Sequence, residues 1–165
     1  MKKVVLTVAS IIIVATVIIV TLIFLRAFRL PFVNVNILGA TYSLTHWVGW
    51  IGALYIAFAT PIYPMVKHRF PKHLRRTLYF HIIGNLTGVL LVSVHFAHQV
   101  TRSASNYPDI GTGIVLYATM LILASTGFMQ YSSLAKRFAK QIKFLHPAFA
   151  LTFYTVIIMH IIQGI

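Results

Sequence analysis

Two stretches of this chain, HIIGNLTGVLLVSVH (residues 81–95) and HPAFALTFYTVIIMH (residues 146–160), are apolar runs that begin and end with histidine. In both, fourteen residues separate the two histidines. On an α-helix fourteen residues fall about 40° short of four full turns, so the two imidazoles share nearly one face, ~21 Å apart along the axis. The purpose of such a pair depends on the solvent around the chain.

The composition predicts a membrane protein. Of 165 residues, 59% are hydrophobic and 9% are charged, whereas soluble domains carry roughly 25% charged residues. The net charge of +13 comes from basic residues in short segments between apolar runs. This pattern indicates membrane topology and binding of anionic lipid or cofactor carboxylates rather than nucleic acid. The absence of cysteine excludes disulfides, thiolate metal sites and covalently attached c-type haem.

Five apolar runs reach the ~20 residues needed to cross a bilayer: 4–25, 44–66, 78–100, 111–131 and 146–164. The fold class predicted is therefore an all-α integral membrane protein with five transmembrane helices in one membrane domain, residues 1–165. Residues 1–30 are expected to form a retained N-terminal anchor helix, because the apolar run exceeds the 7–15 residues typical of a signal peptide. Residues 44–165 are expected to form a four-helix haem-binding bundle.

The distribution of Lys and Arg predicts the orientation. With a cytoplasmic N-terminus, three basic residues lie outside (Arg26, Arg29 and Arg102) and eleven lie inside: Lys2, Lys3, Lys67, Arg69, Lys72, Arg75, Arg76, Lys136, Arg137, Lys140 and Lys143. The positive-inside rule then favours a prokaryotic plasma membrane protein with its C-terminus, and its single acid, Asp109, outside. In the basic connector 132–144, helical spacing predicts either a short helix on the inner surface or an extension of the fourth helix.

The histidines are the candidate metal ligands. The third and fifth runs cross the membrane in the same direction, so His81 and His146 are expected at one depth, and His95 and His160 at another. Two imidazoles that approach one iron from opposite sides are the axial ligands of a six-coordinate haem. We therefore expect two non-covalent b-type haems, an inner one held by His81 with His146 and an outer one held by His95 with His160.

Small and aromatic residues near the histidines fit the same interpretation. Gly88 lies midway along the third run and Gly84 one turn after its first histidine; the missing side chains would give a flat ring room. Phe153, the midpoint of the fifth run, would fill the gap between the haems. Since a residue before proline avoids helical geometry, His146 is expected at the start of its helix, or at a kink, because of Pro147.

Basic residues beside the predicted haems are candidates to bind their propionates: Lys72, Arg75 and Arg76 inside, and Arg102 outside. For the inner set, the positive-inside rule is an equal alternative. His98 would contact an outer propionate or a substrate, or be a polar helix end. His46, with Trp47 and Trp50, indicates either an interfacial aromatic belt or a quinone or metal pocket.

Two alternatives to haem remain. Membrane histidines also form hydrogen bonds between helices with no further role. A non-haem zinc or copper site usually brings three imidazoles to one point, which a separation of ~21 Å along one helix opposes.

The two H-x13-H pairs, with ALYIAFATPI, LRRTLYFHIIGNLTGVLLVSVH and KFLHPAFALTFYTVIIMH, resemble the ferric reductase-like transmembrane superfamily over roughly residues 44–165. Similar spacing occurs in other dihaem bundles, including the cytochrome b of bc-type quinol oxidoreductases. The resemblance implies a dihaem cytochrome b that moves electrons across a membrane. The sequence is expected to depart from the family in two respects. The family's flavin and nicotinamide domain would be absent, and the first helix would be additional.

The function expected is that of an electron-transfer subunit rather than a stand-alone enzyme. Its partners would be membrane lipid and either other subunits of a redox complex or a soluble electron donor or acceptor, with quinone left open. The alternatives are a quinol-oxidising haem anchor of a respiratory complex and a non-redox structural membrane subunit.

Overall fold

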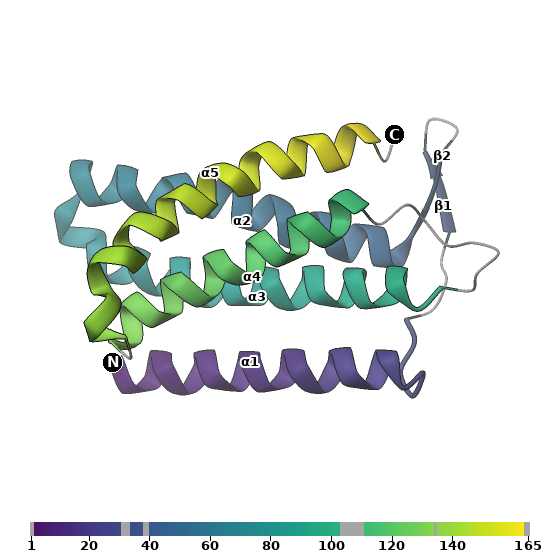
Figure 1. Ribbon diagram of the computed structural model, residues 1–165, viewed down its shortest axis with the longest axis horizontal. Helices are drawn as coiled ribbons and strands as arrows, with labels where there is room; N and C mark the ends of the chain where they lie inside the picture. Colours follow the sequence, from purple (N-terminus) through teal and green to yellow (C-terminus); the bar gives the residue numbers. More distant parts are fainter. Residues whose placement is uncertain (1, 31–33, 38–39, 103–110, 134, 164–165) are drawn as a thin grey trace. The chain divides into compact units, whose positions relative to one another are not determined.

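The computed structural model describes residues 2–30, 34–37, 40–102, 111–133 and 135–163. Its helices are α1 (Lys2–Phe24), α2 (Leu44–Arg69), α3 (Leu74–Val100), α4 (Gly111–Ser132) and α5 (Ala139–Gln163), with short 3₁₀ turns η1 (Pro71–His73) and η3 (Lys136–Phe138) (Figure 1). All five α-helices are long and apolar enough to cross a membrane. This confirms the predicted all-α class and the presence of five helices of membrane-spanning length among the described residues. The chain packs as two compact units, Met1–Pro108 and Asp109–Ile165.

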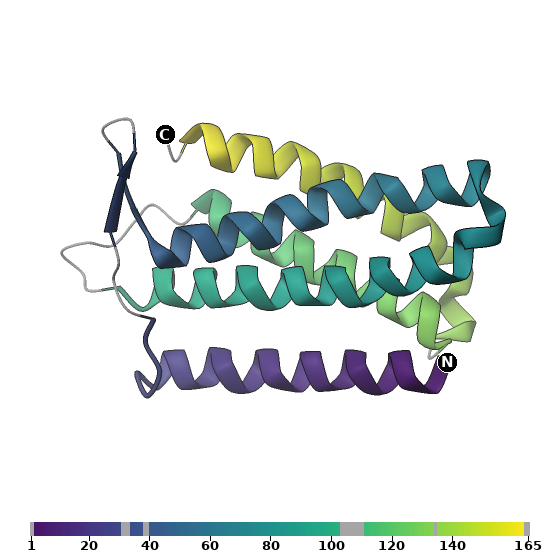
Figure 2. The same ribbon diagram turned by 180° about the vertical axis from the view of Figure 1, so that it is seen from behind.

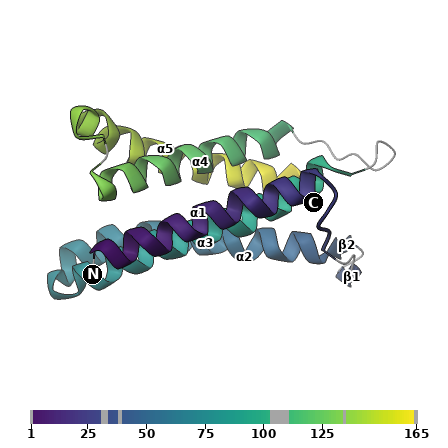
Figure 3. The same ribbon diagram turned by 90° about the horizontal axis from the view of Figure 1, so that it is seen from below.

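In the first unit α3 packs against both α1 and α2 (Figure 3). The helices α2 and α3 approach closely at two glycines. A Cβ built on Gly52 would lie 2.7 Å from the carbonyl oxygen of Gly88, and one on Gly88 would lie 3.0 Å from that of Gly52. Small residues at such a crossing let two membrane helices gain dispersion contacts along their backbones. The crossing therefore fixes the position of α3 against α2.

The contact between α1 and α3 is apolar. Ile23 of α1 is buried with Val94 and Ala97 of α3. Beyond α1 the chain turns at Arg26, whose φ of 57° is left-handed. The Ala27 N–H donates to the Leu22 carbonyl at 2.9 Å, which satisfies one of the carbonyls left open where a helix ends.

A small antiparallel hairpin precedes α2 and was not predicted. Strands β1 (Asn34–Ile37) and β2 (Ala40–Ser43) pair at the end of α2 that is remote from η1 (Figure 2). Ser43 ends the hairpin and is the N-cap of α2.

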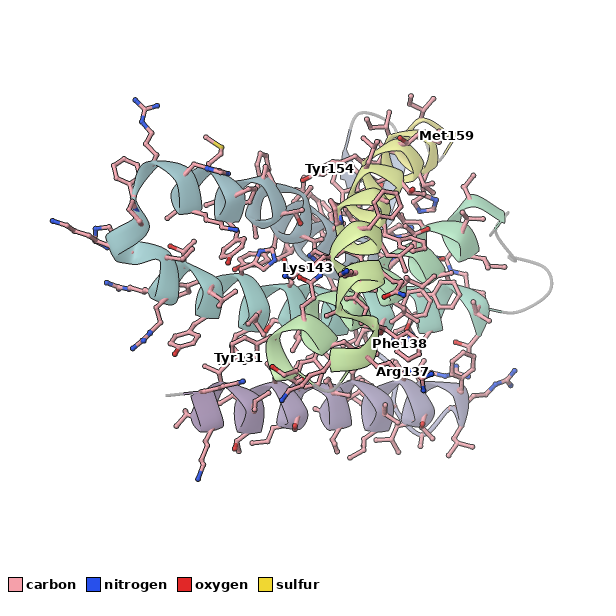
Figure 4. The ribbon with its side chains drawn as sticks, turned by 60° about the vertical axis from the view of Figure 1, so that its left-hand side comes forward. Tyr131, Arg137, Phe138, Lys143, Tyr154 and Met159 are labelled. Carbon is pink, nitrogen blue, oxygen red and sulfur yellow. The ribbon has the colours of Figure 1, made fainter. Side chains whose placement is uncertain are left out.

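The second unit is the helix pair α4 and α5, joined through η3. Ser133, with a φ of 62°, ends α4. The basic connector is therefore not an extension of α4: η3 and the first turns of α5 take it up, and its position on the inner membrane surface stays a prediction. Figure 4 shows Arg137 and Phe138 of η3 and Lys143 of α5 there. Both Phe138 and Lys143 are exposed.

The start of α5 corrects one of the two alternatives expected for His146, a position at the very start of its helix. The helix begins at Ala139, so His146 lies two turns inside it and Pro147 is an internal proline. Membrane helices tolerate internal proline because neighbouring groups and local adjustments satisfy the freed carbonyl. The ribbon of α5 bends in its N-terminal part (Figure 1).

Large apolar side chains are exposed along the helices, for example Val17 (61% exposed), Ile51 (60%) and Leu151 (70%). In water such surfaces would favour association. They occur on each of the five described α-helices, which agrees with the composition and the span lengths.

Candidate haem-ligand histidines

On α3, His81 and His95 both contact the neighbouring helix α2 through Nδ1. The His95 Nδ1 lies 2.9 Å from the carbonyl oxygen of Thr45, at the start of α2. The His81 Nδ1 lies 3.3 Å from the carbonyl oxygen of Ala59. Because α3 is one uninterrupted helix, the two imidazoles are held at two levels of the same helix pair.

On α5, His146 and His160 contact α4 in the same way. The His146 Nδ1 lies 3.1 Å from both the Leu123 carbonyl oxygen and the Thr126 hydroxyl. The His160 Nδ1 lies 3.2 Å from the hydroxyl of Thr112. Each of the four histidines predicted as ligands is thus anchored by Nδ1 to the helix beside its own.

These contacts determine which ring nitrogen carries the proton. A carbonyl oxygen only accepts hydrogen bonds, so Nδ1 must be the protonated nitrogen in His81, His95 and His146. In a neutral imidazole the other nitrogen, Nε2, then has a lone pair in the ring plane. Metal-binding histidines usually have this arrangement, with one nitrogen on the metal and the other donating to a carbonyl, carboxylate or water. For His160 the hydroxyl partner permits the same tautomer.

Glycines on the neighbouring helices lie beside three of the imidazoles, and two of them, Gly49 and Gly127, leave space that a side chain would fill. A Cβ on Gly49 would lie 2.6 Å from Cγ of His95, and one on Gly127 would lie 2.9 Å from Cε1 of His146. A Cβ on Gly113 would lie 3.4 Å from Cε1 of His160. These three glycines were not predicted from the sequence; glycine in an apolar run, as a mark of close helix contact, is the signal that would have found them.

His46 caps the first turn of α2, and the aromatic belt and the quinone or metal pocket expected for it stay predictions. Its Nδ1 accepts a hydrogen bond from the Ser43 N–H at 3.2 Å and lies 2.8 Å from the Ser43 hydroxyl, so the side chain closes the first turn of α2. Its ring lies edge-on to His95, with centroids 5.4 Å apart, and Nε2 is 3.5 Å from the side-chain nitrogen of Gln99. In His46 the Nδ1 lone pair accepts the capping hydrogen bond, so Nδ1 carries no proton. In His95, by contrast, Nδ1 is the protonated nitrogen.

His98 is buried, and its Nε2 accepts a hydrogen bond from the Leu30 N–H at 3.4 Å. The bond ties the segment that follows α1 to the end of α3. It also occupies the lone pair that a metal would need, which favours His95 over His98 as a ligand. A contact of His98 with a propionate or substrate stays a prediction.

Gly84 and Gly88 lie against α2. The space beside Gly84 is filled by the Tyr55 hydroxyl, which donates to the Phe80 carbonyl at 3.1 Å, and the space beside Gly88 by Ile56. Helix packing therefore explains both glycines, and a role beside a haem stays a prediction.

The remaining predicted residues are placed as follows. Phe153 is 1% exposed, and its ring meets that of Tyr154 edge-on, with centroids 6.0 Å apart. On the first turn of α3 Arg75 and Arg76 are exposed, as is Lys72 of η1, and Arg102 is half-buried just beyond Val100. The Arg76 guanidinium lies 5.7 Å from the centre of the Phe80 ring. Propionate binding by these cations stays a prediction.

Comparison of the chain with protein-family models, with curated proteins and with solved structures found no match. The pairing of His81 with His146, and of His95 with His160, joins the two units and also stays a prediction.

Proposed function

We propose that this chain is a dihaem b-type cytochrome of a membrane, which carries electrons between the two faces for a partner oxidoreductase. One observation carries the proposal: all four histidines of the two H-x13-H pairs are anchored by Nδ1 to a neighbouring helix. That common anchor presents Nε2 as the ligand atom. Histidines that only bridge helices have no reason to share one anchoring nitrogen and one spacing.

Two other helical histidines, His46 and His98, differ from the four predicted ligands in how their ring nitrogens are hydrogen-bonded. His46 and His98 each accept a backbone N–H with a ring nitrogen. The lone pairs of these nitrogens are therefore engaged in fixing the start of α2 and the end of α3. In His81, His95 and His146 the opposite holds, because a carbonyl oxygen receives the proton of Nδ1. The hydroxyl partner of His160 is compatible with the same arrangement.

Topology supports the pairing of ligands. In a chain that crosses a membrane five times, α3 and α5 run in the same direction. A separation of fourteen residues on each then places its two histidines ~21 Å apart along the helix, one toward each surface of a hydrocarbon core ~30 Å thick. We propose His81 with His146 as the inner pair and His95 with His160 as the outer pair.

Each bound haem would supply a one-electron Fe(III)/Fe(II) couple. The chain's own residues have three tasks. The carbonyls of Thr45, Ala59 and Leu123 hold the imidazoles in one tautomer and orientation. Apolar helix faces keep water from the ligands. The basic inner connectors face the cytoplasm, where they attract anionic lipid headgroups and, we propose, an electron-transfer partner.

An absorbance spectrum of the purified protein tests this proposal. We expect sharp α and Soret bands after dithionite reduction, and about two haems per chain by pyridine haemochrome analysis. A protein purified from haem-sufficient cells without these bands would contradict the proposal and favour a structural membrane subunit.

A further inference from the structure

Asn85 is a polar side chain on the histidine face of α3, one turn beyond His81. Its carbonyl oxygen Oδ1 is buried and has no hydrogen-bond partner among the described residues. An amide oxygen taken out of water without a partner costs free energy. In a helix of apolar composition, leucine would avoid this cost, so packing alone does not account for the asparagine.

The amide nitrogen of Asn85 shows what the side chain contacts. It lies 3.3 Å from Nδ1 and 3.4 Å from Nε2 of His81. The lone-pair directions of the two ring nitrogens diverge in the ring plane, so an atom equally distant from both lies on neither axis. The contact is therefore with the body of the ring rather than along the lone-pair axis of either nitrogen.

The orientation of the amide follows from the other contacts of His81. Its Nδ1 proton is directed to the Ala59 carbonyl, so the ring offers Asn85 no N–H to accept. The electron-rich ring favours the positive N–H end of the amide over its oxygen. The Tyr63 ring stacks on the same imidazole, with centroids 5.1 Å apart and planes 29° apart.

Among the other described positions one turn after a predicted ligand, Ala150 follows His146, and Gln99 follows His95, with its amide 3.5 Å from His46. The Asn85 amide adds a polar group beside one ligand of the predicted inner haem.

We propose that Asn85 is a positioning residue for the haem ligand His81 and that it raises the midpoint potential of the inner haem. Its N–H fixes the rotation of the imidazole and draws electron density from the ring. A less electron-rich ligand, next to the positive end of an amide dipole, stabilises the ferric ion less and so favours the ferrous state. This inference rests on the proposed function.

The test is a redox titration of the purified Asn85→Leu protein, followed in the α band, together with the EPR spectrum of the ferric protein. The haem that His95→Ala retains identifies the inner component. We expect that component to titrate at a lower potential and its low-spin EPR signal to shift, while the outer component stays unchanged. Thr87→Val is the matched control, because Thr87 is exposed on α3 and its hydroxyl bonds only back to the Ile83 carbonyl at 2.9 Å; it should change neither signal.

If Asn85→Leu does not assemble, Asn85→Ser gives the same readout, since serine is too short to reach the imidazole. Unchanged potentials and EPR signals in a variant that holds two haems would overturn the role of Asn85 and leave the proposed function intact. Equal shifts in the midpoint potentials of the inner and outer haems would also overturn the role of Asn85. A wild-type protein without haem bands would overturn both proposals.

Discussion

The helix pairs α2–α3 and α4–α5 hold their histidines by the same atom and with different partners. On α3 both Nδ1 atoms are directed to backbone carbonyls of α2, those of Thr45 and Ala59. On α5 threonine hydroxyls of α4 take part at both ends, Thr126 for His146 and Thr112 for His160. The α4–α5 pair also has a glycine beside each imidazole, whereas α2–α3 has one beside His95 alone.

The difference shows which imidazole orientations depend on backbone atoms of the neighbouring helix and which depend on its side chains. A carbonyl anchor stays in place whatever the residue, so the orientation of His81 and His95 depends on the packing of α2 against α3. A hydroxyl anchor is removed by one substitution, which makes the α4–α5 pair the more sensitive to mutation of neighbouring residues. Three kinds of substitution test this comparison.

The largest effect is expected from the ligands themselves. His95→Ala, on one helix pair, and His160→Ala, on the other, should each leave one haem per chain, and both should lose the same component of the redox titration. The reason is that a six-coordinate haem loses most of its affinity with one axial ligand gone. Pyridine haemochrome analysis and titration measure this outcome.

The control for these variants is His98→Gln, which should keep two haems because His98 binds the Leu30 N–H. Loss of both haems from His95→Ala, or loss of different components from the two variants, would contradict the pairing of α3 with α5.

A smaller effect is expected from closing the space beside an imidazole. In Gly49→Ala the new methyl would lie 2.6 Å from Cγ of His95, at the base of the ring, where the side chain has least freedom to move. Overpacking of this kind costs ~1–3 kcal/mol, so we expect occupancy of the outer haem to fall about tenfold or more. Gly113→Ala is the matched control, because its methyl would meet Cε1 of His160 at 3.4 Å. Equal haem contents in the two variants would show that the close contact at Gly49 is unimportant.

The helices were predictable because their apolar runs are long and are bounded by basic and proline-containing connectors. The start of α5 was missed because Pro147 was taken as a boundary. The same rule would have ended α2 before Pro61 and Pro64, which also lie inside a continuous helix. The hairpin of β1 and β2 was missed because its four-residue strands are too short to show a period.

The candidate ligands followed from spacing alone, but their surroundings did not. From the sequence, room for a haem was expected on the histidine helices themselves, at Gly84 and Gly88. The structure places the glycines that touch imidazoles on the neighbouring helices, at Gly49, Gly113 and Gly127. Which helix faces which histidine depends on how pairs pack, and periodicity within one segment carries no information about that.

The smallest effects separate the two hydroxyl anchors. Thr112→Val removes the hydroxyl that the structure gives His160, and loss of such a partner typically costs 10–100-fold in metal affinity. We expect haem affinity at the outer site to fall about tenfold. Thr126→Val, of nearly the same shape, should change affinity at the inner site by about twofold or less, because the Leu123 carbonyl still accepts the His146 Nδ1–H at 3.1 Å. Titration of haem into protein produced under haem limitation measures both. Equal losses of haem affinity in the two variants would mean that the Leu123 carbonyl cannot hold His146 without the Thr126 hydroxyl. The backbone carbonyls that anchor His81 and His95 would then have no expected advantage over hydroxyl anchors.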